Sequence, residues 1–147
     1  KDALDDAISA TRAAITEGIV PGGGLALLKA VPLIAADETQ VEGDVRTGLQ
    51  ILRRALEAPA RRIAENSALD AGVVVARMLA EPGNIGFDAS ANAYVDMYEA
   101  GIIDPTKVVR IALENAVSVA SILLLTEATI TDIPEKEAPA QPSFPDA

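Results

Sequence analysis

The sequence of 147 residues contains no cysteine, no histidine and no tryptophan. Without cysteine there is neither a thiol nucleophile nor a disulfide, and without cysteine and histidine the usual ligands of a zinc site are missing. Acid–base catalysis by histidine is excluded within this chain for the same reason. Any chemistry therefore depends on carboxylates, hydroxyl groups and backbone amides.

Aromatic residues are also few, and half of the sequence is hydrophobic through Ala, Val, Leu and Ile; the aromatic residues are Phe87, Phe144, Tyr94 and Tyr98. A core of short side chains requires close packing of backbones, which helices supply well. The length is enough for one domain with a single core. We therefore expect a mainly α-helical fold.

Positive charge is scarce, because 12 Lys and Arg face 22 Asp and Glu, for a net charge of −10. This charge repels a phosphate backbone, so we expect no nucleic-acid partner. The most apolar stretch, 108–125, is interrupted by Arg110 and Glu114, so we expect no membrane span of about 20 residues. The sequence opens at Lys1 inside a helical pattern and without a secretory signal, which predicts a piece of a longer chain.

Apolar residues at helical spacing predict several helices in the first half. Gly18 is suited to end the first helix, and Pro32 predicts a kink or a restart within the second. Asp44 is suited to cap the third, and Pro59 to begin a separate short helix that ends at Asn66. A further helix follows Asp70. The predicted helices cover 1–17, 25–36, 44–58, 59–66 and 71–79.

The second half has a turn at 81–84 and a short strand at 85–88. Asp104-Pro105 predicts a helix start, with Asp104 as the cap and Pro105 at the first position. The helix that follows is apolar on nearly all sides, which predicts that it is buried on all sides. We expect that the 147 residues are too few to cover both of its faces. We expect a C-terminal strand within 126–133, and a disordered, dispensable Pro-rich tail over 134–147.

Three features carry possible chemistry. Pro21-Gly22-Gly23-Gly24 before a helix could bring the backbone close to a ligand, although by itself the pattern favours a flexible turn and is no Walker loop. Asp6 lies on a polar helix face, where a solvated surface charge is the commoner case. Asp2 and Asp6 are one helical turn apart and could share a metal ion, a pairing that is common by chance.

Four separated segments, in order, resemble the group I chaperonins of the GroEL type, in the carboxy-terminal part of their equatorial ATP-binding domain. They are 5–14 with 17–24 (DDAISATRAA and EGIVPGGG), 55–59 with 63–66 (ALEAP and IAEN), 86–89 (GFDA) and 101–107 (GIIDPTK). The resemblance covers residues 4–134. It implies that residues 1–133 are a portion of the helical bundle of that domain, with a short β-hairpin or strand and the C-terminal strand.

The resemblance also implies roles for single residues. Asp6 matches the aspartate that positions the hydrolytic water, and Gly23 a glycine that contacts the nucleotide. Residues that match the base and ribose contacts are Asp88, Ala89, Ser90, Ile102 and Asp104. Arg61 and Asp70 match positions of contact between rings. Asp88 stands where many bacterial members have Asn, which leaves its base contact uncertain.

For the whole protein, the resemblance implies an ATPase that folds proteins as two stacked seven-membered rings with a co-chaperonin. ATP would bind with Mg²⁺ and K⁺, but no metal ligand is expected here, because the phosphate loop and the Mg²⁺ aspartate belong to the amino-terminal part of the domain. Unfolded proteins and the co-chaperonin would bind to other domains. Expected locations are the bacterial cytoplasm, a mitochondrion or a plastid. The alternatives are a helical assembly module without nucleotide activity and a small carboxylate metalloenzyme.

Overall fold

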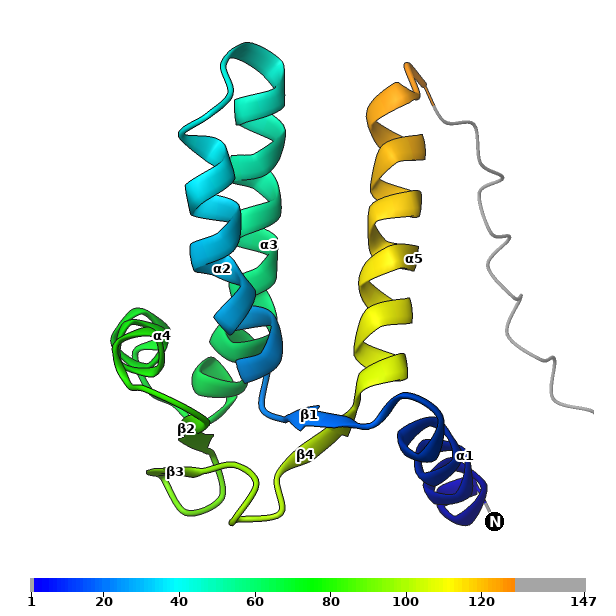
Figure 1. Cartoon of the computed structure of the whole chain (residues 1–147), viewed down its shortest axis with the longest axis vertical. Coiled ribbons are helices and arrows are strands. Elements are labelled where there is room, and N and C mark those ends of the chain that lie inside the picture. The colour runs from blue at the N-terminus through cyan, green and yellow to red at the C-terminus, as the bar shows by residue number, and fades with distance from the viewer. Residues whose placement is uncertain (1, 129–147) are drawn as a thin grey trace, which may run out of the picture. The chain divides into compact units, whose positions relative to one another are not determined.

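The computed structural model describes residues 2–128, with the side chains described from Leu4 onward. The chain divides into two compact units, one ending at Leu113 and one beginning at Glu114. Five helices and four short strands make up the described part (Figure 1). The helices are α1 (Asp2–Glu17), α2 (Leu25–Glu38), α3 (Gly43–Asn66), α4 (Ala71–Ala80) and α5 (Thr106–Leu125), the last running across the division. The expected mainly α-helical fold is confirmed.

The core of the first unit lies where α2 and α3 pack side by side and α4 crosses them (Figure 1). Leu25 and Leu28 of α2 are fully buried, as is Met97, which follows the strands. Small residues let the helices approach closely, because Ala60 and Ala64 of α3 are buried among them. The buried set is Leu25, Leu28, Val31, Leu56, Ala60, Ala64, Val74, Val75, Met78, Phe87 and Met97.

The strands form two antiparallel pairs that bring distant segments together. Strand β2 (Ile85–Asp88) pairs with β3 (Ala93–Asp96) as a hairpin, which confirms the predicted strand at 85–88. Strand β1 (Ile19–Pro21) pairs with β4 (Ile103–Pro105), and Val20 lies opposite Asp104. This second pair joins residues more than 80 positions apart and was not predicted, since strands of three residues give no periodic signal.

The separate helix predicted to begin at Pro59 is wrong, and of the kink or restart predicted at Pro32 the restart is not found. Helix α3 runs from Gly43 to Asn66 with Pro59 inside it, and α2 does not restart at Pro32. A proline in a helix removes one hydrogen bond to the preceding turn. Ala55, whose carbonyl loses that bond to Pro59, is exposed and open to water, while Leu56 and Ala60 are buried on either side. The packing of the flanking residues therefore keeps the helix continuous.

The predicted caps at Asp44 and Asp104 are also wrong. Helix α3 begins at Gly43, so Asp44 lies in its first turn, where a negative charge favours the helix dipole. Asp104 and Pro105 belong to β4, and α5 begins at Thr106. The amide of Thr106 donates to the carbonyl of Gly18, at 3.1 Å, so the strand pairing extends up to the first helical residue. In contrast, Gly18 does end α1, with a φ of 81°.

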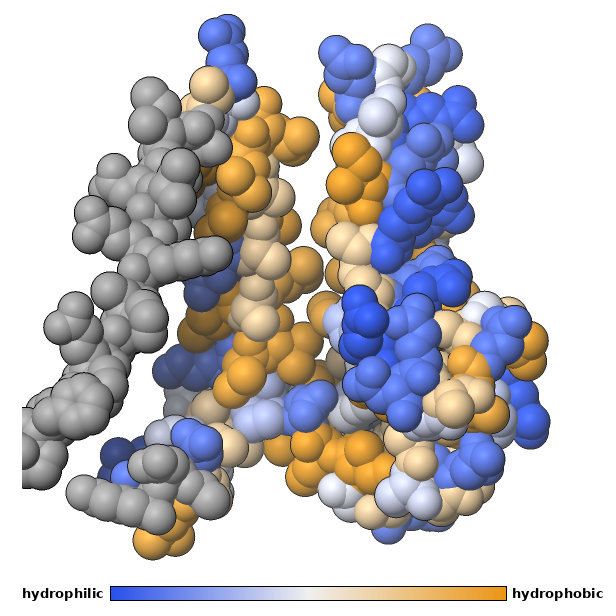
Figure 2. Space-filling view, turned by 180° about the vertical axis from the view of Figure 1, so that it is seen from behind, coloured by the Kyte–Doolittle hydropathy of each residue, from blue (hydrophilic) through white to orange (hydrophobic). Residues whose placement is uncertain are grey.

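Exposed apolar surface marks both α1 and α5. The predicted stripe of α1 is exposed, with Ile15 81% accessible, and no described residue of α5 is buried. The predicted burial of α5 on all sides is therefore not found in this chain, and hydrophobic residues line the helix in Figure 2. By length and composition alone α5 could cross a membrane, contrary to expectation, although core helices of soluble proteins share these properties. The expected C-terminal strand and tail lie largely outside the described residues.

Candidate functional site

The glycine turn between β1 and α2 lies directly against the segment that leads into β4. The amide of Gly22 donates to the carbonyl oxygen of Ile102 at 2.9 Å. A Cβ atom at Gly22 would lie 3.1 Å from the carbonyl carbon of Ile102, tighter than most real contacts. Only a residue without a side chain lets these two backbone segments approach so closely. The turn is thus fixed in place by tertiary contacts and is no loose connection.

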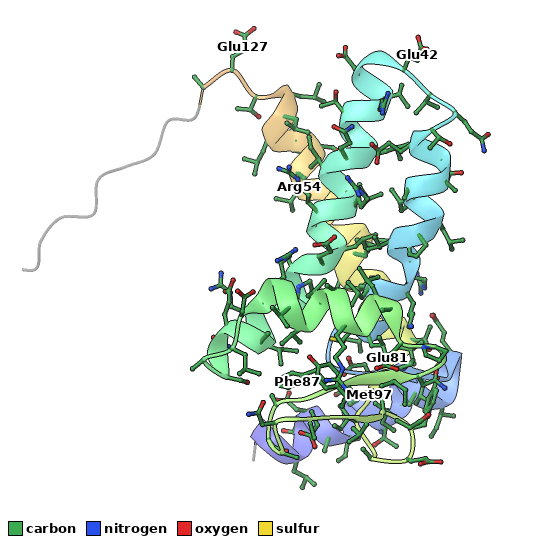
Figure 3. All side chains as sticks on the ribbon, turned by 90° about the vertical axis from the view of Figure 1, so that its left-hand side faces the viewer. Glu42, Arg54, Glu81, Phe87, Met97 and Glu127 are labelled. Atoms are coloured by element: carbon green, nitrogen blue, oxygen red, sulfur yellow. The ribbon has the colours of Figure 1, made fainter. Side chains whose placement is uncertain are left out.

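Gly23 and Gly24 have left-handed backbone conformations, with φ of 65° and 77°. A Cβ at Gly23 would lie 2.8 Å from the Cε atom of Met97 and 3.7 Å from the carbonyl oxygen of Phe87. Met97 is fully buried and lies close to Phe87 in Figure 3. The turn at Gly23 therefore contacts the β2–β3 hairpin at Phe87, which is the residue before Asp88.

The hairpin turn is organised by the carboxylate of Asp88. Its Oδ1 atom accepts hydrogen bonds from the Ser90 amide at 2.8 Å, the Ser90 hydroxyl at 2.7 Å and the Ala91 amide at 3.2 Å. The hydroxyl bond from Ser90, followed by the two amide bonds, lowers the pKa of Asp88. Asp88 therefore has a definite structural role, and it holds Ala89 and Ser90 in an exposed turn.

The segment from Ile102 to Asp104 forms the other side of the region. The Ile102 side chain packs against the core, and its amide donates to the carbonyl of Met97 at 2.8 Å. Asp104 is half-buried and opens onto a hollow of about 190 Å³ between α1, β1 and β4. This volume is below the roughly 300 Å³ of the smaller ligand pockets, so the hollow can hold only part of a nucleotide. The lining residues are Ala10, Thr11, Ala14, Ile19, Ile103, Asp104 and Pro105.

Asp6 does not line this hollow. It is exposed on α1, one helical turn before Ala10, which lines the hollow. The C-terminal end of α1 is held in place by an ion pair. Arg110 of α5 donates to both carboxylate oxygens of Glu17, at 3.0 and 2.7 Å. This ion pair lowers the pKa of Glu17 through the hydrogen bonds from Arg110. The helix that carries Asp6 is thus oriented relative to β4.

Arg61 and Asp70 have local partners on their own helices. Arg61 of α3 donates through Nε and Nη2 to Glu57, at 3.0 and 2.7 Å. Asp70 caps α4 as predicted, because its Oδ1 accepts from the amides of Gly72 and Val73 at 2.8 and 3.2 Å. These contacts give both residues a structural role within the chain. The contacts between rings stay a prediction for both residues.

The structure therefore places Gly23 and Ile102 against Met97, and Asp104 beside α1. Asp88 follows Phe87, whose carbonyl oxygen lies near Gly23. Sequence reasoning missed Met97 and the Glu17–Arg110 pair. No local pattern indicates a pair formed by residues 93 positions apart. Among the described side chains, no group of three or more His, Cys, Asp or Glu residues could hold a metal ion.

The described part of the chain is thus a helical domain with a closely packed glycine turn, an Asx-type hairpin turn and the carboxylate of Asp104 at a shallow hollow. The family model of the TCP-1/cpn60 chaperonin family matches residues 1–134. The chain belongs to this family.

Two relatives illustrate the match. Chaperonin GroEL 5 of Bradyrhizobium diazoefficiens is 74% identical over 135 residues, which cover 92% of this chain and 25% of that protein. The crystal structure of a group III chaperonin in the open state has a TM-score of 0.74 at 28% identity, over 80% of this chain and 25% of that chain. The chain thus spans about a quarter of the length of the relatives that it matches.

Proposed function

We propose that this chain forms one wall of the ATP site in an ATP-dependent, protein-folding chaperonin. The observation that carries the proposal is the rigid packing of the glycine turn on Ile102 and Met97, in a chain 74% identical to a GroEL protein. In support, two of the predicted nucleotide positions, Gly23 and Ile102, both lie against Met97. The remaining walls, and the phosphate loop, would come from a longer chain.

The residues fit part of a nucleotide. Left-handed glycines expose backbone amides at the start of α2, where the helix dipole favours a phosphate oxygen. Asp104 has a carboxylate that can accept from ribose hydroxyls, and the helix-cap role that would have occupied it is not found. Ile102 and the 88–90 turn would contact the base and ribose. Mg²⁺ bound with ATP, and K⁺, would neutralise phosphate charge, but through ligands outside this chain.

Asp6 would orient the water that attacks the terminal phosphate. An exposed carboxylate one helical turn before Ala10, which lines the Asp104 hollow, can accept a hydrogen bond from a water molecule and hold one lone pair of that water toward the phosphate. The Glu17–Arg110 pair would keep α1, and hence Asp6, at the correct distance. Isolated from the phosphate-binding segment, the chain should show no ATPase activity.

The wider proposal follows the family. The chain would assemble in two stacked seven-membered rings, with Arg61 and Asp70 in contacts between rings, and would act on unfolded proteins with a co-chaperonin that binds elsewhere. The exposed apolar residues of α5 would be covered by other parts of the longer protein, which favours a buried helix over a membrane span. The location would be the bacterial cytoplasm, a mitochondrion or a plastid.

The test uses a chimera in which this chain replaces the matching 135 residues of the Bradyrhizobium protein. Single-turnover ATP hydrolysis and nucleotide affinity are measured for Asp6→Ala, for Asp104→Ala, and for Asp5→Ala as the matched control. Asp5 is the neighbouring exposed carboxylate on the same helix. We expect Asp6→Ala to slow hydrolysis by roughly 10²–10⁴-fold with unchanged ATP affinity, Asp104→Ala to weaken affinity, and Asp5→Ala to change neither.

Two outcomes would contradict the proposal. A chimera with an intact sequence that neither binds nor hydrolyses ATP removes the proposed function. A chimera in which Asp6→Ala and Asp5→Ala hydrolyse ATP at the same rate removes the role of Asp6, and Asp6 would then be a solvated surface charge.

A further inference from the structure

Positive charge in this acidic protein is concentrated on one helix. Five of the 12 Lys and Arg residues lie on the 24-residue α3, namely Arg46, Arg53, Arg54, Arg61 and Arg62. The same helix has three acidic residues, Asp44, Glu57 and Glu65. In a protein with a net charge of −10, this segment is therefore a local patch of the opposite sign.

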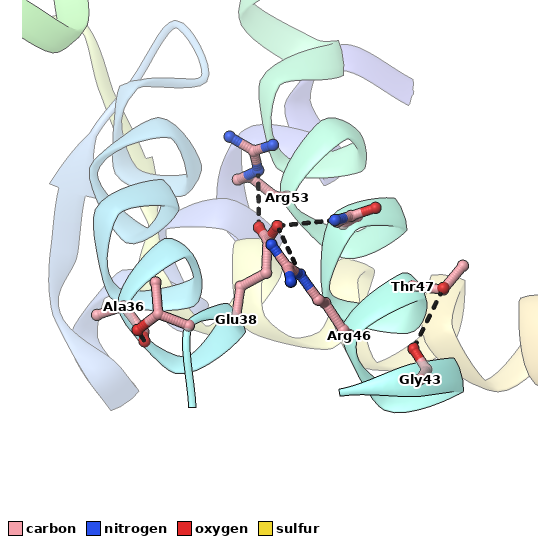
Figure 4. A network of polar contacts seen from close by, with 8 residues as sticks. Ala36, Glu38, Gly43, Arg46, Thr47 and Arg53 are labelled. Carbon is pink, nitrogen blue, oxygen red and sulfur yellow. Dashed lines mark hydrogen bonds and ion pairs between the residues drawn. The ribbon is translucent and has the colours of Figure 1, made fainter. Parts of the chain in front are cut away.

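The carboxylates near α3 are already used by particular arginines. Glu38 of α2 accepts from Gln50 at 2.8 Å and lies 3.9 Å from Nε of Arg46 and 3.4 Å from Nε of Arg53 (Figure 4). Glu57 binds Arg61 through two hydrogen bonds, and Glu65 pairs with Arg62 at 3.1 Å. These pairs partly neutralise the charge along α3, and Arg54 is left without a carboxylate partner among the described residues.

Arg53 and Arg54 retain unused hydrogen-bonding capacity. Nε of Arg53 is buried and has no hydrogen-bond partner, since the ion pair to Glu38 does not meet the geometry of a hydrogen bond. No carboxylate of the described residues lies within 4 Å of the Arg54 guanidinium group, which projects from α3 in Figure 3. Arg61 uses Nε and Nη2 on Glu57, which leaves its Nη1 without a protein partner in the described part.

These three arginines meet at a hollow on the surface of α3. A hollow of about 460 Å³ is lined by Arg53, Arg54, Glu57 and Arg61, which we call the arginine groove. A second hollow of about 250 Å³ adjoins it and shares Arg53 and Arg54. The lining of the arginine groove has three positive charges and one negative charge, and Glu38 pairs with Arg53 from beside it, so the local formal charge is +1. Its volume lies within the range of small-ligand sites.

We propose that the arginine groove is a binding site for a small anion with several phosphate groups. Guanidinium groups donate paired N–H bonds that match phosphate oxygens, and their charge strengthens these bonds. Arg54 and Arg61 are seven residues apart, about 10 Å along the helix axis, a span that a row of phosphates can follow. The terminal phosphate of a chain carries close to two negative charges where a carboxylate carries one, which favours a phosphate chain over an acidic peptide in this positively charged groove.

The site is separate from the proposed nucleotide site, and it shares Arg61 with the proposed contacts between rings. Arg53 and Arg54 lie in the middle of α3, whereas the glycine turn contacts α3 at Ala60 through Gly24. The phosphate groups could belong to inorganic polyphosphate or to a free nucleoside triphosphate. Both share the chemistry that the groove recognises, and they differ only in the nucleoside.

The experiment is calorimetric titration of the 147-residue chain with inorganic tripolyphosphate at low salt, compared with ATP. The variants are Arg54→Gln and Arg53→Gln, and Arg62→Gln is the matched control, because Arg62 lies on the same helix, is 75% exposed and does not line the groove. Arg54→Lys keeps the positive charge and removes the planar guanidinium group with its paired N–H donors. We expect saturable binding that Arg54→Gln weakens roughly tenfold, Arg54→Lys less, and Arg62→Gln less than twofold.

The outcomes separate the possibilities. Absence of saturable tripolyphosphate binding, or equal weakening by Arg54→Gln and Arg62→Gln, overturns the proposal, since the positive charge of α3 as a whole would then account for any attraction. Equal binding of ATP and tripolyphosphate, both dependent on Arg54, supports a site that recognises phosphates alone, and preference for ATP supports one that also contacts the nucleoside. Circular dichroism of each variant establishes that its helices are intact.

Discussion

Replacing Gly24 by alanine tests the closest contact between α2 and α3. Gly24 precedes α2 with a φ of 77°, and its carbonyl accepts the amide of Leu28 at 3.1 Å. A Cβ atom at this position would lie 2.7 Å from the amide nitrogen of Ala60, 3.1 Å from its Cα and 3.2 Å from its Cβ. Two of these three atoms are backbone, so relief requires movement of the buried helix α3.

Two costs add in this variant. An L-residue in the left-handed region costs roughly 1–2 kcal/mol relative to glycine. Overpacking of a close-packed contact costs about 1–3 kcal/mol more. We therefore expect Gly24→Ala to lower the free energy of unfolding by roughly 2–5 kcal/mol, a large part of the stability of a small domain.

Two other glycines provide matched controls, because a Cβ at either would meet nothing within 4 Å. Gly43 has a φ of 63°, so Gly43→Ala should incur only the backbone cost of about 1–2 kcal/mol. Gly48 lies inside α3 without a positive φ, so Gly48→Ala should stabilise the protein by up to about 1 kcal/mol. The difference between Gly24→Ala and Gly43→Ala isolates the contact with Ala60.

The assay is urea denaturation of the 147-residue chain, followed by far-ultraviolet circular dichroism, with stability compared at equal m-values. The expected order of stability is Gly48→Ala, the unmodified chain, Gly43→Ala and then Gly24→Ala. If Gly24→Ala and Gly43→Ala lose the same stability, the two helices do not approach at Gly24, and the description of the glycine turn as rigidly packed is incorrect.

Three further predictions concern the ends of helices and the hairpin turn. Asp70→Ala should destabilise α4 by about 1 kcal/mol in the same assay, whereas Asp70→Asn, which keeps the capping oxygen, should have a smaller effect. Glu17→Gln should lower the thermal midpoint at neutral pH but not well below the usual carboxyl pKa, because a glutamate with a lowered pKa stabilises the fold only while it is ionised; equal losses at both pH values would contradict the ion pair with Arg110. Asp88 has a folded pKa below its unfolded value, so its contribution is present above the unfolded pKa of about 3.9 and is lost as the pH falls through the lowered folded value. Ser90→Ala removes the largest cause of this shift, so NMR titration of the Asp88 carboxyl should show a higher pKa, and an unchanged pKa would refute the turn geometry.

The sequence by itself determined the features that depend on neighbouring residues. Local periodicity and turn chemistry predict four such features. They are the helix α2 that begins at Leu25, the helix start after Asp70, the end of α1 at Gly18 and the strand at 85–88. The order of the short motifs was enough to indicate the chaperonin family, because motif order does not require knowledge of packing.

Only the tertiary structure decided the features that depend on distant partners. Pro59 remains inside a helix because Leu56 and Ala60 are buried on either side of it. Asp104 lies in a strand because β1, more than 80 residues away, supplies its hydrogen-bonding partner. In both cases the local propensity of proline or aspartate is worth only a few kcal/mol, and long-range packing or strand pairing outweighs it. The same reason explains why a run of three glycines, which by itself indicates flexibility, forms the most closely packed turn of the proposed site.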